Sequence, residues 1–143
     1  MAHVRISIAS QSFTARLELA RAPRTCRTFL ARLPYRARII HARWSGEACW
    51  IPLGAEDLGL GPENATSYPQ PGQVLLYPGG ISETEILLPY GPVRFSSQAG
   101  QLAGNHFLTI DDAGDRLQAL GNLVLWQGAQ EIEFAIADED GCV

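Results

Sequence analysis

Two histidines carry the side chains best suited to chemistry in this sequence. His41 and His106 each lie in a segment with strand-like alternation, and a neutral imidazole can act as a base, a hydrogen-bond partner or a metal ligand. Two histidines without a third ligand make a poor metal site, and neither a His-x-His nor a His-Glu-x-x-His spacing occurs. We therefore expect no metal. A structural histidine held by internal hydrogen bonds stays the alternative for each, and His106 is the better functional candidate.

Aromatic and polar residues at the ends of predicted strands are candidates for binding a ligand. Tyr77 and Tyr90 each adjoin proline and glycine, where an amphipathic ring can contact a small ligand or pack in a core. Asn105 would project an amide from the start of a strand. Arg43 and Trp44 would offer a guanidinium beside an indole to an anionic or planar ligand, although the indole suits a protein interior equally well.

Acidic and sulfur-containing residues give weaker indications. Glu83 and Glu85 would share one face of an extended segment, where paired carboxylates can perform acid–base work, but two acids on the solvent face of a hairpin are the commoner arrangement. Cys26, Cys49 and Cys142 share no Cys-x-x-Cys spacing and predict buried or inert thiols. Gly-x-Ser-x-Gly, Walker and dinucleotide-binding patterns are absent, so we expect no cofactor.

Basic charge is concentrated at the start of the chain. All 11 basic residues are arginines; nine lie in the first 43 positions with one acid, Glu18, whereas the other 100 residues contain two arginines and 14 acids, which gives +8 and −12. The net charge of −4 argues against nucleic acid as a partner. The arginines would instead meet carboxylates within the fold or across a homo-oligomer contact, because their planar fork suits carboxylates.

Alternating and periodic segments predict one domain, mainly β, over residues 1–143. No run of about 18 apolar residues and no signal peptide is present, so we expect no membrane partner and a cytoplasmic protein. The expected elements are strands over 3–9, 13–19, 37–44, 47–53, 73–78, 84–89, 105–110 and 131–136, a long loop over 54–72, and helices over 23–33 and 113–126, the second with a break at Gly121 as an alternative. About eight short strands with one or two short helices favour a closed β-barrel, because closure removes exposed edges.

Several short motifs, in order, resemble the cyclophilin-like proteins. The Pro-x-Thr-x-x-x-Phe-x-x-x-Leu spacing from Pro23 to Leu33 is similar to their first helix, Ile40-His41 stands where they carry Phe-His-Arg, and Ala99-Gly100 followed by Gly104-Asn105-His106-Phe107 resembles their Ala-Gly and Gly-Ser-Gln-Phe segments. A closer likeness is to a small family of uncharacterised bacterial cyclophilin-like proteins, through Arg43 to Glu47, Pro71 to Gly79 and Tyr90 to Pro92. The resemblance implies a closed cyclophilin-like β-barrel of about eight strands.

The resemblance also implies a surface groove that binds a small molecule or a short peptide. The groove would be lined by Arg43, Tyr77, Tyr90, Asn105 and His106. The alternative is a divergent peptidyl-prolyl cis-trans isomerase in which Arg43 and His106 are catalytic, since isomerases of this fold direct a guanidinium at the prolyl nitrogen to weaken amide resonance. Alignment on His41 puts Ala42 at the position of that arginine, so Arg43 would need a bulge to reach the groove.

Overall fold

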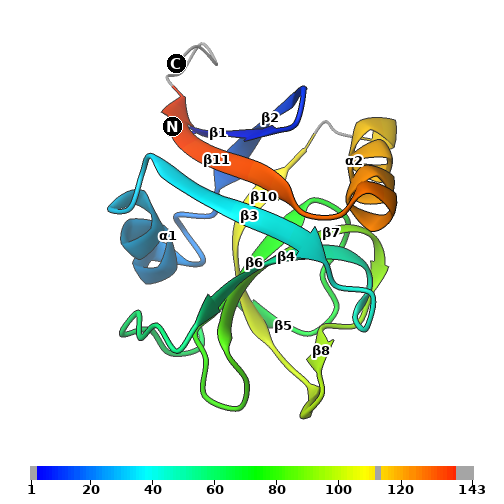
Figure 1. Cartoon of the computed structure of the whole chain (residues 1–143). Coiled ribbons are helices and arrows are strands. Elements are labelled where there is room, and N and C mark those ends of the chain that lie inside the picture. Colours follow the sequence, from blue (N-terminus) through cyan, green and yellow to red (C-terminus); the bar gives the residue numbers. More distant parts are fainter. Residues whose placement is uncertain (1–2, 112–113, 138–143) are drawn as a thin grey trace.

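The computed structural model describes residues 3–111 and 114–137 and is a closed antiparallel barrel. The barrel strands are β1 (His3–Ile8), β2 (Gln11–Leu17), β3 (Tyr35–His41), β4 (Gly46–Gly54), β6 (Gln73–Tyr77), β7 (Thr84–Val93), β10 (Gly104–Ile110) and β11 (Gln130–Ala137). Their order around the ring is β2, β1, β11, β3, β4, β7, β6, β10, and β10 pairs with β2 to close it (Figure 1). A short extra strand, β5 (Ala65–Thr66), pairs with β10. The predicted fold class is confirmed.

The first hairpin follows from strict alternation. Val4, Ile6 and Ile8 are fully buried inside the barrel, whereas the residues between them are partly exposed, because successive side chains of a strand point to opposite faces. β1 lies between β2 and β11, with Ile6 opposite both Phe13 and Phe134. A one-residue slip would expose this whole apolar set, so burial fixes the register.

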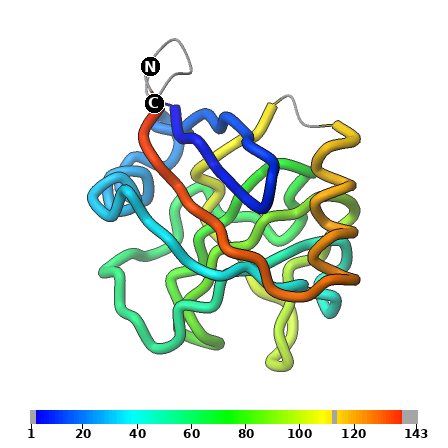
Figure 2. The backbone as a smooth tube through the Cα atoms, turned by 45° about the horizontal axis from the view of Figure 1, so that its top comes forward, coloured from blue at the N-terminus to red at the C-terminus, as the bar shows by residue number. Residues whose placement is uncertain are grey.

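The two helices lie on opposite sides of the barrel (Figures 1 and 2). Helix α1 (Pro23–Leu30) begins at the predicted proline, ends three residues before the predicted Leu33, and buries Cys26 and Phe29. The ring of Phe29 meets that of Phe134 edge-on, with centroids 5.1 Å apart. This packing joins the helix to the interior core.

A second, smaller apolar cluster lies outside the barrel. β7 is buried on both faces: Ile86 and Leu88 pack in the interior core, whereas Leu87 packs in the outer cluster. A segment that we call the flap, residues 94–103, covers this outer face and contains β8 (Ser96–Ser97) and β9 (Gly100–Gln101). Phe95 and Leu102 anchor it in the cluster. The flap strands and β5 are too short to be indicated by the sequence pattern.

Helix α2 (Gly114–Gln127) covers β3, β4 and β7 with one apolar face. It confirms the predicted helix from position 114 onward, position 113 lying outside the described residues, and it runs unbroken through Gly121. Gly121 packs directly on the ring of Tyr90: a Cβ added there would lie 2.3 Å from two ring carbons. The glycine is therefore required by the close approach of α2 to β7.

We expect Gly121→Ala to destabilise the protein by about 2 kcal/mol. Alanine improves helix propensity by roughly 1 kcal/mol relative to glycine, but overpacking a tight contact costs about 1–3 kcal/mol, and the Tyr90 ring leaves no room for a methyl group. Urea unfolding measures the change. Gln118→Ala, on the exposed face of the same helix, is the matched control, and a stabilising Gly121→Ala would contradict this packing.

Over the described residues, neither helix has the length and apolar character that crossing a membrane would require.

Candidate functional site

A cavity of about 570 Å³ lies between the flap and the outer face of the barrel. We call it the flap cavity; it is lined by Trp44, Trp50, Ser82, Glu83, Glu85, Ser97, Gln98 and Ala99. These residues come from the β3–β4 turn, from β4, from the β6–β7 connection and β7, and from the flap. Three segments far apart in the sequence therefore build one site.

Two tryptophans form the aromatic wall of the flap cavity. The rings of Trp44 and Trp50 meet edge-on with centroids 5.4 Å apart and an interplanar angle of 82°. Trp44 lies in the turn after β3 and is 54% exposed. Buried Ser45 attaches this turn to the flap, because its hydroxyl donates to the carbonyl of Ser96 and accepts from the N–H of Ser96. The turn and the flap thus hold Trp44 at the entrance.

Glu85 brings a buried carboxyl group to the flap cavity. The residue is 3% exposed, and its Oε2 is buried without a hydrogen-bond partner. Burial, with a smaller contribution from the charge of Glu83, raises the pKa of Glu85 to about 8. At neutral pH the free protein therefore holds a protonated carboxyl group, which can both donate and accept a hydrogen bond. The expectation that both acids lie on a solvent face is wrong for Glu85.

The register of the sheet explains why Glu85 has no partner. Glu85 lies opposite Pro52 on β4 and opposite Tyr77 on β6. The ring of Pro52 offers no hydrogen-bonding group on this face, and the Tyr77 hydroxyl accepts hydrogen bonds from the N–H groups of Ile81 and Ser82. The indole N–H of Trp50, on the same face of the sheet, is also buried without a partner. The wall of the cavity thus holds one unused donor, the indole N–H of Trp50, and one partnerless carboxyl oxygen, Oε2 of Glu85.

Tyr77 and Asn105 line a different cavity, of about 540 Å³, on the other side of the β6–β7 connection. Asn105 is fully buried. Its Oδ1 accepts from the N–H of Glu63, and its Nδ2 donates to Thr25 Oγ1 and to the Gly61 carbonyl. The Asn105 amide is therefore committed to internal hydrogen bonds.

Tyr90 is buried in the interior core, where helix α2 packs on its ring. Its hydroxyl is 2.6 Å from Nε2 of His41, and the two rings meet edge-on. Burial, followed by the charge of Arg43, lowers the pKa of His41. His41 is therefore held neutral beside a tyrosine.

His106 and Arg43 are not brought together. His106 belongs to a hydrogen-bonded chain between β10 and the residue after β2: its Nε2 is 2.7 Å from Thr109 Oγ1, and Thr109 donates to Glu18 at 2.6 Å. Since the single Thr109 proton goes to Glu18, Nε2 of His106 is the donor to Thr109. Burial lowers the pKa of His106 although Glu18 opposes this.

Arg43 is exposed in the β3–β4 turn. The predicted strand over 37–44 ends at His41, so the strand alternation that would place Arg43 on the face opposite Ala42 does not extend to it. Three strands, β4, β7 and β6, separate β3 from β10 around the ring.

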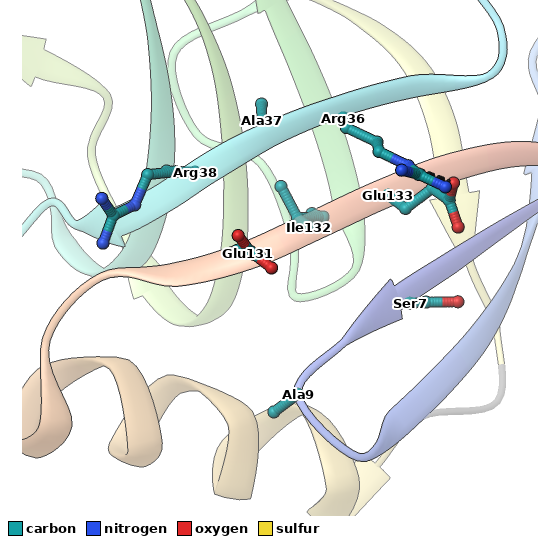
Figure 3. A pocket seen from close by; sticks show the side chains of 8 residues that line it. All are labelled: Ser7, Ala9, Arg36, Ala37, Arg38, Glu131, Ile132 and Glu133. Atoms are coloured by element: carbon teal, nitrogen blue, oxygen red, sulfur yellow. Dashed lines mark hydrogen bonds and ion pairs between the residues drawn. The ribbon is translucent and has the colours of Figure 1, made fainter.

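A third cavity, of about 620 Å³, lies on the outer face of β3 and β11 and extends to β1 (Figure 3). Its walls are charged and exposed: Arg36 and Glu133 point toward each other, with Nε and Oε2 2.7 Å apart. Arg16 also pairs with Asp111, and Arg32 with Glu56. These pairs join the arginine-rich start of the chain to its acidic remainder within one fold. None of the residues that line this cavity has a buried polar side-chain atom without a hydrogen-bond partner.

The described cysteines do not supply a nucleophile. Cys26 and Cys49 are free and buried, and burial raises the pKa of their thiols to about 11 and about 12. Cys142 lies outside the described residues. Within positions 3–111 and 114–137, no group of three or more acidic, histidine or cysteine side chains is placed to hold a metal ion.

These features define a closed eight-stranded barrel with a flap-covered cavity on its outer face. The chain belongs to the DUF3830 family, described as "Protein of unknown function (DUF3830)", whose profile matches residues 4–136. No curated protein matches the sequence.

Two solved structures have a similar fold. One is a structure of McbB in complex with tryptophan, with a TM-score of 0.70 and 19% identity over 92% of this chain; this chain spans only 44% of the McbB chain. The other is the solution structure of the hypothetical protein AF2241 from Archaeoglobus fulgidus, with a TM-score of 0.61 and 18% identity over 94% of this chain and 93% of that one. At these identities the likeness is one of fold.

Proposed function

We propose that this protein binds a small organic molecule in the flap cavity. The observation that carries the proposal is the pair of buried polar groups without partners, the carboxyl of Glu85 and the indole N–H of Trp50, beside one cavity. Leaving a buried polar group unpaired costs about 1–3 kcal/mol. A ligand that pairs with both groups recovers this cost, which favours binding.

The size and walls of the cavity support this function. Small-molecule sites commonly occupy roughly 300–1,000 Å³ and combine an apolar lining with a few polar groups, and the flap cavity of about 570 Å³ has two indoles and two carboxyl groups. The structure of McbB, which has a similar fold, is described as a complex with tryptophan. That complex supports a planar ligand of about that size here.

The relationship with the cyclophilin-like proteins belongs to the same proposal. Two observations support this relationship: the barrel is closed and has eight strands, and Ala99, from the Ala-Gly motif that resembles the cyclophilin-like proteins, lines the flap cavity. The ligand site that we propose differs from the groove predicted from the sequence, because Trp44, Trp50 and Glu85 take the place of the five residues that groove would contain. Prolyl isomerisation stays a prediction from the resemblance.

Ligand binding is tested with a panel of small metabolites in a thermal-shift screen, followed by titration of tryptophan fluorescence. We expect at least one planar compound to raise the melting temperature and to quench emission. Trp50→Phe, which keeps the apolar wall but removes the N–H, should weaken binding about tenfold.

Trp126→Phe is the matched control, because Trp126 is 79% exposed and lies on α2. Equal losses of affinity in Trp50→Phe and Trp126→Phe would show that the ligand does not bind in the flap cavity. A panel without any stabilising compound would contradict the proposed function.

A further inference from the structure

The charged groups that line the flap cavity are of one sign. The lining contains Glu83 and Glu85 and no basic residue. On β4, Pro52 lies opposite Glu85 and Trp50 lies two residues away on the same face. On β6, Tyr77 lies opposite Glu85. The flap contributes Ser97 and Gln98. No arginine is among these facing groups, so the carboxyl of Glu85 lacks a cation supplied by the lining.

The aromatic wall, like the acidic lining, favours a positively charged ligand. The faces of indole rings carry negative electrostatic potential and attract cations, and tryptophan is the strongest of the aromatic side chains in this respect. Trp44 and Trp50 both line the cavity and meet at 82°, so a cation between the flap and β4 lies beside two indole rings. An anionic ligand would instead meet two carboxyl groups.

We infer that the ligand of the flap cavity is an organic cation, a primary ammonium or guanidinium on a planar apolar body. The cation pairs with the Glu85 carboxylate, and the apolar body packs against Trp44 and Trp50. This inference rests on the proposed function and adds the chemical class of the ligand.

Binding of a cation is coupled to loss of a proton from Glu85. Glu85 is protonated in the free protein at neutral pH, because burial and Glu83 raise its pKa to about 8. The bound cation favours the charged carboxylate. The O–H bond of the carboxyl group therefore breaks, the proton goes to solvent, and the carboxylate remains beside the ammonium or guanidinium group.

The inference is tested by calorimetric titration with matched probes: tryptamine and phenethylamine as cations, indole-3-acetamide and phenylacetamide as neutral analogues, and indole-3-acetate as the anion. We expect at least one cation to bind about tenfold or more tightly than its neutral analogue. Titrations at pH 7 in buffers of different ionisation enthalpy should show release of about 0.9 proton per cation, since a group with a pKa near 8 is about nine-tenths protonated there.

Variants distinguish the inference that the ligand is a cation from the proposal that the flap cavity binds a ligand. Glu85→Gln should weaken cation binding about tenfold or more and abolish proton release, while the neutral analogue binds as before. Glu131→Gln, an exposed acid on β11, is the control and should change neither. Tighter binding of the neutral or anionic probes would overturn the cation inference and leave the proposed function standing. No binding by any probe, together with a negative thermal-shift screen, would overturn both.

Discussion

Glu85→Gln leaves the free protein within about 1 kcal/mol of the wild type at pH 5 but makes it more stable by about 4 kcal/mol at pH 8. The reason is the pKa of Glu85, which is raised from 4.5 to about 8 in the folded state by burial and by Glu83. The carboxyl of the unfolded chain loses its proton near pH 4.5, whereas the folded protein keeps the proton until about pH 8. The unfolded state therefore binds fewer protons in this window.

The sign of the pH dependence follows from this difference. Stability falls as pH rises through any range in which the unfolded state binds fewer protons than the folded state, at a rate of up to about 1.4 kcal/mol per pH unit. The contribution of the neutral Glu85 carboxyl is full below pH 4.5 and is lost as pH rises to about 8. Glutamine does not ionise, so the stability of Glu85→Gln does not show this fall with pH.

Urea unfolding between about pH 5 and pH 8 measures the effect, as the difference between variant and wild type at each pH. Histidines and other groups that titrate in this range contribute to both proteins and cancel. Glu131→Gln should follow the wild-type curve, because Glu131 is exposed on β11. Parallel curves for Glu85→Gln and the wild type would show that Glu85 is ionised in the folded protein and would remove the basis for the coupled proton release.

The barrel could be predicted from the sequence because its signals are local. Val4, Ile6 and Ile8 alternate with polar residues in a strand that has one buried face, and Pro23 marks the start of a helix with apolar residues at helical spacing. The structure confirms these elements and the closed fold class. The ends of elements were less accurate, since β3 stops at His41 where the buried Ala42 begins a turn.

The flap cavity could not be predicted in the same way, because it depends on contacts between distant segments. One local signal was available: Ile86, Leu87 and Leu88 form a continuous apolar run, which indicates a strand buried on both faces. That pattern would have placed Glu85 in a buried position. Nothing local indicates that the flap lies over β7, since its anchors, Phe95 and Leu102, are single apolar residues that form no periodic pattern.

Asn105 is a residue that the sequence suggests for ligand binding but that has a structural role. The sequence marks it as a polar residue beside a histidine, which suggests a ligand contact. In the structure its three hydrogen bonds join β10 to the start of α1 and to residues 61–63. The Glu63 carboxylate in turn accepts from the N–H and hydroxyl of Thr25. Because Ala22 gives no side-chain cap, Glu63 performs this role for α1, and Asn105 holds Glu63 in place.

We expect Asn105→Ala to destabilise the protein by about 3–4 kcal/mol. Asn105 is fully buried, and its removal leaves the N–H of Glu63 and the carbonyl of Gly61 without their partner. Each unsatisfied buried group costs about 1–3 kcal/mol. Asn105→Asp should not rescue stability, because it loses both donated hydrogen bonds and places a carboxylate oxygen against the Gly61 carbonyl.

The matched control is Asn122→Ala, which makes the same chemical change on the exposed face of α2. It should be neutral or slightly stabilising, by about 0.5 kcal/mol, since alanine is the better helix former. Urea unfolding compares the three variants with the wild type. Hydrogen exchange at the N–H of Thr25 and of Glu63 should accelerate in Asn105→Ala and stay unchanged in Asn122→Ala. Near-equal stabilities of Asn105→Ala and Asn122→Ala would show that the hydrogen bonds of Asn105 do not hold the start of α1, and would free its amide for a ligand in the neighbouring cavity.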